Sequence, residues 1–320
     1  MSVKMEEPRL VLVTPLYNDW ECLPPLFRDI ETALDGACAS WHLLVVNDCS
    51  TIVPDDNLQI LNDPRISRVN LLTNVGHQRA ILVGLCHIFQ QQTEADIVVV
   101  IDSDGEDRPQ DIPSLVRSCM EQKDPTVVFA RRAKRSEGWP FVGFYRLYKL
   151  GFRLLTGRRI VFGNYSCFPS SLLSRICHSP DFWNHYSSAL IKSRIPYLSI
   201  PTKRGSRYSG TSKMNFNSLI LHGLSSFSVY IEAIIVRVLI SSFFAILLLF
   251  VALAGITYLR AFTPFAILGW ASFLFGILLN VILTVFFFNI VIILSHLNAR
   301  KSPIQSPMSF YKGLIQNPEE

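Results

Sequence analysis

Two long uncharged stretches near the C-terminal end constrain this chain more than any other feature. Of its 55 charged residues, only three fall among the 69 residues from 229 to 297. Residues 238–259 carry no charge and correspond to a helix about 33 Å long at 1.5 Å per residue, which matches the roughly 30 Å of a bilayer's hydrocarbon core. Residues 261–295 are uncharged too. We therefore expect two membrane-spanning helices that form a hairpin.

Burial inside a large soluble protein is the alternative for these stretches. Apolar helices in such a protein need amphipathic partner helices to cover them, and the rest of the sequence offers none. The apolar fraction of 49% and the mean hydropathy of +0.30 are high for a fully soluble chain, and they exclude a disordered or fibrous one. We expect a soluble domain followed by a membrane domain.

The positions of lysine and arginine predict the orientation in the membrane. Basic residues are enriched in the cytoplasmic flanks of membrane helices. They precede the first stretch and follow the second, whereas the short connection holds only Arg260. The N-terminus has no apolar segment of the kind that a cleavable signal peptide needs. We expect a cell-membrane protein with two spans and both termini in the cytoplasm.

Cysteine usage and net charge limit the range of partners. The seven cysteines form no C-x-x-C pair, so in a cytosolic domain we expect reduced structural thiols. The net charge is +5, and the basic residues gather before the first apolar stretch rather than alternating with aromatic residues. This pattern indicates an anionic lipid or phosphate partner and argues against nucleic acid. Assembly into a homo-oligomer is left open.

Short β-rich runs alternate with stretches of helical periodicity over the first 130 residues. This alternation predicts an α/β domain with a mainly parallel sheet. We also expect amphipathic surface helices over residues 141–155 and 215–230, the second lying along the membrane. The order of elements in residues 160–200 is left open. The expected strands are 10–14, 41–46, 69–72, 97–101 and 126–130, and the expected helices are 23–34, 77–91 and 111–122.

Residues that follow the strands are the candidates for chemistry, because open parallel sheets bind ligands beyond the carboxyl ends of their strands. The fourth strand runs directly into Asp102, Asp104, Glu106 and Asp107. Carboxylates this close repel one another, and a divalent cation bound to a diphosphate relieves that repulsion. A solvated acidic turn is the simple alternative. The loop after the first strand has no glycine, which excludes a dinucleotide fingerprint and a P-loop there.

Basic residues form a second candidate group. Arg131 and Arg132 follow the fifth strand, and residues 203–213 form a basic loop before the first apolar stretch. Guanidinium and ammonium groups suit phosphate oxygens. Since basic residues before a span obey the positive-inside rule in any membrane protein, the charge of the loop does not by itself identify a binding site.

Taken together, these motifs resemble the polyprenyl-phosphate glycosyltransferases, inverting enzymes of the GT-A fold that include dolichol-phosphate mannose synthase and the bacterial undecaprenyl-phosphate sugar transferases. The resemblance covers roughly residues 9–300. The chain departs from the family pattern at Glu106, Arg108 and Gln110, and Asn164 stands where many bacterial relatives carry aspartate. The matching motifs are Pro15-Leu16-Tyr17-Asn18-Asp19, Asn47-Asp48-x-Ser50, Asn74-x-Gly76-x-x-x-Ala80, Asp102-x-Asp104-x-Glu106-Asp107-x-Pro109 and Arg207-x-x-Gly210-x-Ser212-Lys213.

The resemblance implies a fold, an activity and a set of site residues. The implied fold is a GT-A nucleotide-sugar-binding domain followed by an interfacial helix and a two-helix transmembrane hairpin. The implied activity moves a sugar from a UDP- or GDP-linked donor to a polyprenyl monophosphate with inversion, for glycan or lipid modification at the cell envelope. Mg²⁺ or Mn²⁺ would be held by Asp104 and Glu106. The implied catalytic groups are Asp102, Asp104 and Arg131, and the implied ligand-binding groups are Pro15, Tyr17, Asn18, Asp48, Arg132, Arg207 and Lys213.

A phosphate nucleophile is already largely ionised near pH 7, so no strong general base is needed at Asn164.

Two competing functions and four segments complete these expectations. A membrane-tethered phosphatase built on Asp102 and Asp104 competes with the transferase, and so does a non-catalytic membrane scaffold. A scaffold leaves the clustering of polar motifs at successive strand ends unexplained. The segments are a cytosolic catalytic domain (1–214), an interfacial helix (215–230), two transmembrane helices (231–299) and a cytoplasmic tail (300–320).

Overall fold

The computed structural model describes residues 7–54, 58–132, 150–158, 163–210, 223–263, 269–299 and 305–316, without the side chains of Arg132 and Trp270. The chain divides into two compact units. The sheet unit consists of Met1–Lys149, Arg159–Val229 and Gln305–Glu320, and the membrane unit consists of Leu150–Arg158 and Tyr230–Ile304.

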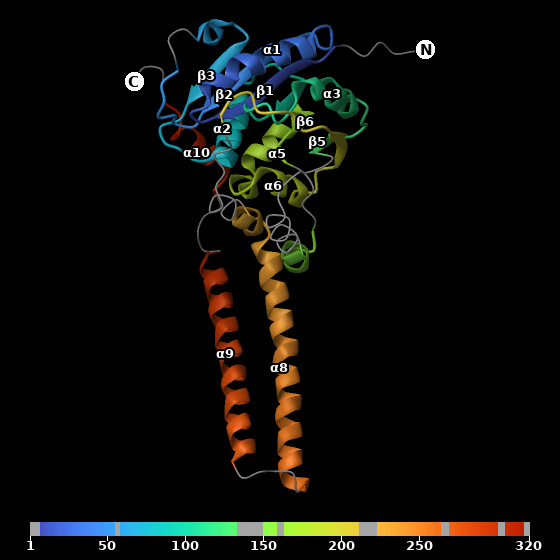
Figure 1. The fold of residues 1–320 in the computed structure, drawn as a ribbon, viewed down its shortest axis with the longest axis vertical. Coiled ribbons are helices and arrows are strands. Elements are labelled where there is room, and N and C mark those ends of the chain that lie inside the picture. Colours follow the sequence, from blue (N-terminus) through green and yellow to red (C-terminus); the bar gives the residue numbers. More distant parts are fainter. Residues whose placement is uncertain are drawn as a thin grey trace. The chain divides into compact units, whose positions relative to one another are not determined.

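A seven-stranded sheet forms the centre of the sheet unit (Figure 1). The strand order is β3-β2-β1-β4-β6-β5-β7, and β6 runs antiparallel to β4 and β5 whereas the other neighbouring strands are parallel. The predicted α/β fold with a mainly parallel sheet is therefore confirmed. The strands are β1 (Arg9–Leu16), β2 (Ser40–Asn47), β3 (Ile66–Asn70), β4 (Ile97–Val100), β5 (Val127–Arg132), β6 (Ser166–Pro169) and β7 (Tyr197–Thr202).

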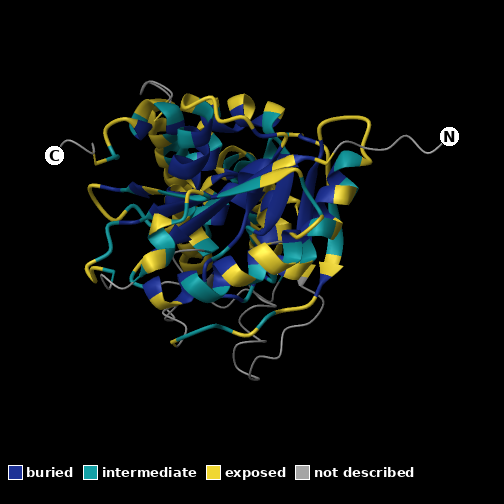
Figure 2. Ribbon diagram, turned by 90° about the horizontal axis from the view of Figure 1, so that it is seen from above, coloured by how far each residue is buried: buried dark blue, intermediate teal, exposed yellow. Residues whose placement is uncertain are grey.

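Helices cover both faces of this sheet. One face packs against α1 (Leu23–Leu34) and α3 (Ile112–Met120). The other packs against α2 (His77–Gln90), α5 (Leu173–His178), α6 (Tyr186–Lys192) and α10 (Pro307–Tyr311). In Figure 2 the central strands are dark blue, and they lie between helices that carry yellow on their outer surfaces.

Burial on both faces explains why the central strands are apolar throughout. In β1, Leu10 and Leu12 belong to the core on the α1 side, whereas Val11 and Val13 belong to the core on the α2 side. All four residues of β4 are buried. Because successive strand residues point to opposite faces, a strand covered on both sides reads as a continuous apolar run.

Close packing of α2 on the sheet depends on one glycine. A Cβ atom at Gly84 would lie 2.7 Å from side-chain methyl groups of Val13 and Val46. Only a residue without a side chain allows the helix to approach β1 and β2 this closely.

The segment that the sequence pattern left open contains β6, α5, α6 and β7. The strand β6 is only four residues long, and it enters the sheet between β4 and β5. Its Ser166 hydroxyl lies 2.9 Å from the hydroxyl of Tyr186 on α6. This segment completes the sheet with an inserted antiparallel strand.

The chain returns to the sheet unit after the membrane helices. The hydroxyl of Tyr311 on α10 lies 2.8 Å from Nδ1 of His87 on α2. The backbone N–H of Leu72 donates to the carbonyl of Leu314 at 2.9 Å, which extends the sheet edge beyond β3. Residues 305–316 are therefore an integral part of this unit.

The membrane unit contains two long apolar helices, α8 (Ile231–Phe262) and α9 (Trp270–Ala299). They pack side by side (Figure 1). The candidate spans Ile231–Phe262 and Ala271–Ala299 each contain an 18-residue window with a mean hydropathy of 2.8. Large apolar side chains such as Phe243, Leu248 and Phe288 are exposed along them. This length and composition agree with the expected membrane hairpin.

A short helix over residues 150–156 belongs to the same unit. The ring of Phe152 meets that of Tyr230 edge to face, with centroids 5.7 Å apart. Nη1 of Arg237 in α8 donates to the carbonyl of Leu154 at 3.1 Å. A carbonyl in the last turn of the short helix therefore stabilises the positive charge of Arg237 near the start of α8. The predicted surface helices lie partly outside the described residues, and their described parts are helical at 150–156 and 223–228.

Candidate functional site

The acidic turn after β4, residues 102–107, lies at the carboxyl edge of the sheet and is braced by its own backbone. The backbone N–H of Glu106 donates to Oδ1 of Asp104 at 2.9 Å. The buried Asp107 accepts from the backbone N–H of Asp102 at 3.3 Å. The turn therefore holds the carboxylates of Asp102, Asp104 and Glu106 close together.

Negative charge is in excess at this turn. Burial and the neighbouring carboxylate of Asp102 raise the pKa of Asp104 above its ordinary value. A raised carboxyl pKa means that the charged form is disfavoured, so a cation at this position is stabilising.

The loop of residues 203–210 lies against the acidic turn through its backbone and its arginines. The backbone N–H of Gly205 donates to the carbonyl of Glu106 at 2.9 Å. Nη2 of Arg204 lies 2.6 Å from Oε1 of Glu106, and Nη1 of Arg207 lies 3.1 Å from Oδ2 of Asp104. Two guanidinium groups therefore neutralise carboxylates of the turn.

Tyr208 fastens this loop on the other side. Its backbone N–H donates to the carbonyl of Asp104 at 2.9 Å, and its hydroxyl donates to Asp29 of α1 at 2.7 Å. Gly105 has a φ of +86°, and a Cβ atom there would lie 2.7 Å from the Tyr208 ring. Glycine is required at position 105 by both the backbone conformation and the ring above it.

His77, the first residue of α2, lies beside the first carboxylate of the turn. Its Nε2 is 3.2 Å from Oδ1 of Asp102. Burial disfavours the charged imidazole, but Asp102, Asp107 and Asp104 outweigh it and raise the pKa of His77. The carboxylates therefore draw this histidine towards its charged form.

A polar chain connects His77 to the core. The backbone N–H of Tyr186 donates to Oε1 of Gln78 at 2.9 Å, so Nε2 of Gln78 is the donor to Oδ1 of Asn164 at 3.1 Å. Nδ2 of Asn164 then lies 3.0 Å from Nε2 of His77. The side chain of Asn164 therefore contacts other side chains at the edge of the site.

Asn18 and Asp48 organise the loops after β1 and β2. Oδ1 of Asn18 accepts from the backbone N–H of Ile52 at 2.9 Å. Asp48 is 3% exposed, and its two oxygens accept from the backbone N–H groups of Val75 at 2.7 Å and Gly76 at 3.0 Å. Burial raises the pKa of Asp48, and the two backbone bonds oppose that shift. Both side chains shape the rim of the site.

The structure brings only part of the predicted site together. The acidic turn and Arg207 are in contact. Arg131 is exposed at the end of β5, which β6 separates from β4. The remaining residues are Pro15, buried in β1; Tyr17, 39% exposed after β1; Arg132, whose side chain lies outside the described residues; and Lys213, which also lies outside them.

Sequence reasoning missed His77, Arg204 and Tyr208 as neighbours of the acidic turn. His77 follows Gly76 at the start of α2, the helix that comes after β3. Open parallel sheets bind ligands at the carboxyl ends of their strands, so a ligand-binding residue is expected at this position. Arg204 and Tyr208 stand in the basic loop, but no local pattern links that loop to a turn about 100 residues earlier.

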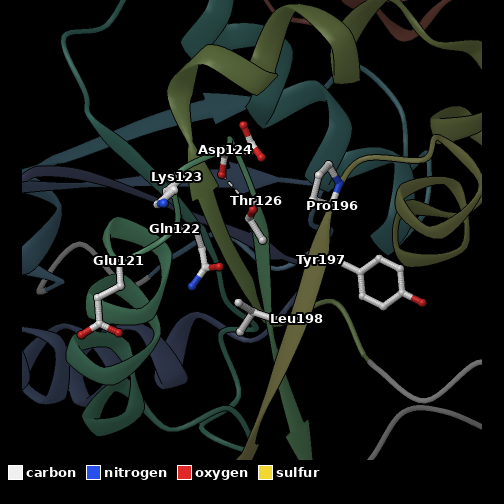
Figure 3. A pocket seen from close by; sticks show the side chains of 8 residues that line it. All are labelled: Glu121, Gln122, Lys123, Asp124, Thr126, Pro196, Tyr197 and Leu198. Atoms are coloured by element: carbon white, nitrogen blue, oxygen red, sulfur yellow. Dashed lines mark hydrogen bonds between the residues drawn. The ribbon is translucent and has the colours of Figure 1, made fainter.

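A cavity of about 420 Å³ lies at the opposite edge of the sheet (Figure 3). It is lined by residues before β5 and at the start of β7, including Asp124, Thr126 and Tyr197. In Figure 3 the Thr126 hydroxyl bonds to the Asp124 carbonyl, at 2.8 Å. Because this cavity adjoins the amino ends of parallel strands, it is separate from the acidic turn.

The acidic turn fits a divalent cation that is shared with a ligand. Among the described residues, no group of three or more histidine, cysteine or acidic side chains could hold a metal ion. One or two carboxylates together with substrate phosphates are, however, a common way to hold Mg²⁺. Asp104 and Glu106 supply hard oxygen ligands for this arrangement.

Comparison with known proteins identifies relatives of this chain. The sequence profile of Glycosyl transferase family 2 matches residues 11–175, just over half of the chain. The undecaprenyl-phosphate 4-deoxy-4-formamido-L-arabinose transferase of Sodalis glossinidius (strain morsitans) is 27% identical over 237 residues, which cover 69% of this chain and 67% of that protein. The enzyme of the same name from Salmonella choleraesuis (strain SC-B67) is 26% identical over 224 residues, covering 66% and 64%.

The chain thus spans about two thirds of the length of the curated relatives that it matches. Among solved structures, glucosyl-3-phosphoglycerate synthase from Mycobacterium tuberculosis, in complex with Mn²⁺, uridine-diphosphate-glucose and phosphoglyceric acid, aligns with a TM-score of 0.49 and 16% identity. The alignment covers 71% of this chain and 80% of that chain.

Proposed function

The chain belongs to glycosyl transferase family 2, and we propose that it transfers a sugar from a nucleoside-diphosphate donor to a polyprenyl monophosphate in the membrane. The observation that carries this proposal is the acidic turn after β4 with the arginine loop seated on it, in a chain that also has two candidate membrane spans. The names of the curated relatives support the acceptor class. The product is a polyprenyl-phosphate sugar for glycan or lipid modification at the cell envelope.

The donor, linked to UDP or GDP, binds over the carboxyl ends of β1, β2 and β4. Asp104 and Glu106 would hold the divalent cation, Mg²⁺ or Mn²⁺, and the cation would supply positive charge to the donor diphosphate. Asp102 orients the donor, and His77 holds Asp102 from the other side. Tyr17 is exposed at the end of β1 and offers a ring to the nucleotide.

Asn18 and Asp48 act indirectly on the donor. Their side chains hold the loops after β1 and β2 by hydrogen bonds to backbone N–H groups. Pro15 is buried in β1 and positions the start of the same loop. We assign these three residues to the shape of the nucleotide pocket.

The acceptor side consists of basic residues. Arg131 at the end of β5 holds the lipid phosphate, together with Arg132, Arg207 and Lys213. A phosphate oxygen attacks the anomeric carbon and forms the new C–O bond as the bond to the nucleoside diphosphate breaks, which inverts the anomeric configuration. Because the attacking phosphate is largely ionised near pH 7, no side chain has to remove a proton.

The proposed topology places the catalytic domain (1–214), the interfacial helix (215–230) and both termini on the cytoplasmic side, with the two membrane helices in 231–299. The return of the chain to the sheet unit supports it. Leu314 and Tyr311 bond to Leu72 and His87, so the segments before and after the hairpin belong to one folded unit. A folded unit lies on one side of a membrane, and the flanking basic residues indicate the cytoplasmic side.

The proposal is tested with the purified full-length protein in detergent. It is incubated with Mn²⁺, a polyprenyl monophosphate and one UDP- or GDP-linked sugar at a time, and the lipid product is identified by mass spectrometry. We expect one donor to yield a polyprenyl-phosphate sugar. Release of inorganic phosphate from the lipid without sugar transfer would instead identify the competing phosphatase.

A further inference from the structure

Two arginines occupy the carboxylate oxygens that a cation needs. Nη1 of Arg207 lies 3.1 Å from Oδ2 of Asp104, while Oδ1 of the same carboxylate is used by the turn itself. Nη2 of Arg204 lies 2.6 Å from Oε1 of Glu106. In the described structure, side chains of the 203–210 loop are thus paired with two of the four carboxylates of the acidic turn.

A guanidinium group and a divalent cation cannot share these oxygens at low energy. Both carry positive charge, and at separations of a few ångströms in a partly buried site their repulsion is strong. The cation must therefore displace Arg207 and Arg204 in order to bind.

Arg207 is only partly satisfied in its present position. Its Nε–H is buried and has no hydrogen-bond partner among the described residues. Its second ion pair, from Nη2 to Asp19, is 3.6 Å long. A buried donor without a partner is destabilising, so this arginine leaves its position at a smaller free-energy cost than a fully bonded one.

The loop keeps an anchor that does not depend on the carboxylates. The hydroxyl of Tyr208 donates to Asp29 of α1 at 2.7 Å, and the hydroxyl of Ser209 donates to Glu21 at 2.8 Å. The backbone N–H of Tyr208 bonds to the carbonyl of Asp104. The two arginine side chains can therefore swing away while Tyr208 keeps the loop beside the site.

We propose that the 203–210 loop is a cation-operated latch, in which Arg204 and Arg207 hold the acidic turn until a divalent cation replaces them. The displaced guanidinium groups are then free to bind phosphate oxygens of the substrates. This inference rests on the proposed function for its cation and its phosphates. It makes cation binding the step that prepares the arginines for phosphate.

The first test is calorimetric titration of the full-length protein with MnCl₂ in the absence of any nucleotide sugar. We expect Arg204→Ala and Arg207→Ala to bind Mn²⁺ about three- to tenfold more tightly than the unaltered protein, because a competing ion pair is removed. Lys203→Ala is the matched control, since it removes a positive charge from the same loop but not from the two ion pairs, and it should leave the affinity unchanged. Unchanged or weaker Mn²⁺ binding by both arginine variants would overturn the latch.

The second test needs no substitution and so does not depend on how the variants fold. Trypsin cleaves after an arginine only when the arginine side chain enters the specificity pocket of the protease. An arginine that is held in an ion pair is therefore protected from cleavage. We expect Mn²⁺ to increase cleavage after Arg204 and Arg207, with cleavage after the exposed Lys123 unchanged as an internal control. Mn²⁺-dependent protection of the two arginines would contradict the latch.

The latch and the proposed function fail in different ways. Normal sugar transfer together with no effect of the arginine substitutions on Mn²⁺ binding removes the latch and leaves the transferase intact. If Mn²⁺ exposes the arginines but the protein transfers no sugar, the proposed reaction is wrong. The competition between Mn²⁺ and the two arginines for the carboxylates of the acidic turn would still hold.

Discussion

The two carboxylate oxygens of Asp104 have different partners. Oδ1 accepts from the backbone of its own turn, and Oδ2 contacts Arg207. The adjacent Asp102 has a different partner, since its oxygen lies beside His77. Asp102 and Asp104 thus have different environments in the fold although both follow the same strand.

Replacing Asp104 by asparagine removes the anionic ligand and keeps the size of the side chain. We expect Asp104→Asn to lower turnover by about a hundredfold or more, because charge that develops on the leaving diphosphate loses its stabilisation. Turnover and Mn²⁺ affinity are the measurements. Asp124→Asn, at the opposite edge of the sheet, is the control. Near-normal turnover of Asp104→Asn would show that the acidic turn is a solvated surface turn with no role in the reaction.

Substitution of Arg131 is the most direct test of how the acceptor phosphate is bound. We expect Arg131→Ala to reduce turnover of the polyprenyl phosphate ten- to hundredfold, as predicted by loss of a charge-assisted bond of about 1.5–3 kcal/mol. Binding of the nucleoside diphosphate should stay within about twofold, and Arg117→Ala on α3 is the control. An equal loss of nucleotide affinity would move Arg131 to the donor side.

Asn164 tests whether the reaction uses a base. An aspartate at this position could still accept from Gln78, and its second oxygen would face His77, leaving that imidazole between two carboxylates. We expect Asn164→Asp to raise the KM for the polyprenyl phosphate without raising kcat at neutral pH, because the added charge repels the acceptor. Asn164→Ala separates the effect of charge from loss of the amide. A large gain in kcat for Asn164→Asp would show that a base is used.

At the scale of elements, α2 connects the core to the site. Its buried side packs on β1 and β2 through Gly84, and its first residue, His77, stands beside the acidic turn. A change in how deeply this helix packs therefore acts on both stability and the position of His77.

Gly84→Ala tests that packing. The new methyl group would meet Val13 and Val46 at 2.7 Å, so we expect a loss of about 1–3 kcal/mol in stability from overpacking, measured by thermal unfolding in detergent. Gly276→Ala in α9 is the control, since among the described residues nothing beyond the backbone of its own helix and its chain neighbours lies within 4 Å of its Cβ position. Equal melting temperatures for the two variants would contradict the close contact.

At the scale of the whole chain, the membrane hairpin is an insertion into a folded unit. The strand edge at Leu72 is completed by Leu314, which follows both membrane helices. The last described residues are therefore joined to the edge of the sheet.

Cysteine labelling from outside intact cells tests this topology. We expect a membrane-impermeant thiol reagent to label Ala261→Cys, at the far end of α8, and to spare Lys312→Cys, which follows α10. The unaltered protein supplies the background for its own seven cysteines. Labelling of Lys312→Cys from outside would overturn both the topology and the supply of a cytoplasmic donor.

Local patterns in the sequence determined the membrane hairpin, the alternation of strands and helices, and the acidic turn. The length of an apolar stretch, helical periodicity and the residue type that follows a strand all depend on neighbouring positions. They can therefore be recognised in the sequence without knowledge of the fold. The seven-stranded order was not among them: β6 has four residues and pairs with strands far away in the chain, and such a short segment carries no periodicity.

Only the tertiary structure decided which groups meet at the site. Arg207 contacts Asp104, His77 lies beside Asp102, and Leu314 pairs with Leu72. Each of these pairs joins residues 25 to 242 positions apart, and their contact depends on how the helices and loops pack around the sheet. The sequence by itself determined that carboxylates and arginines were present, because residue type is local. Their pairing depends on distance in space, and therefore only the fold decided it.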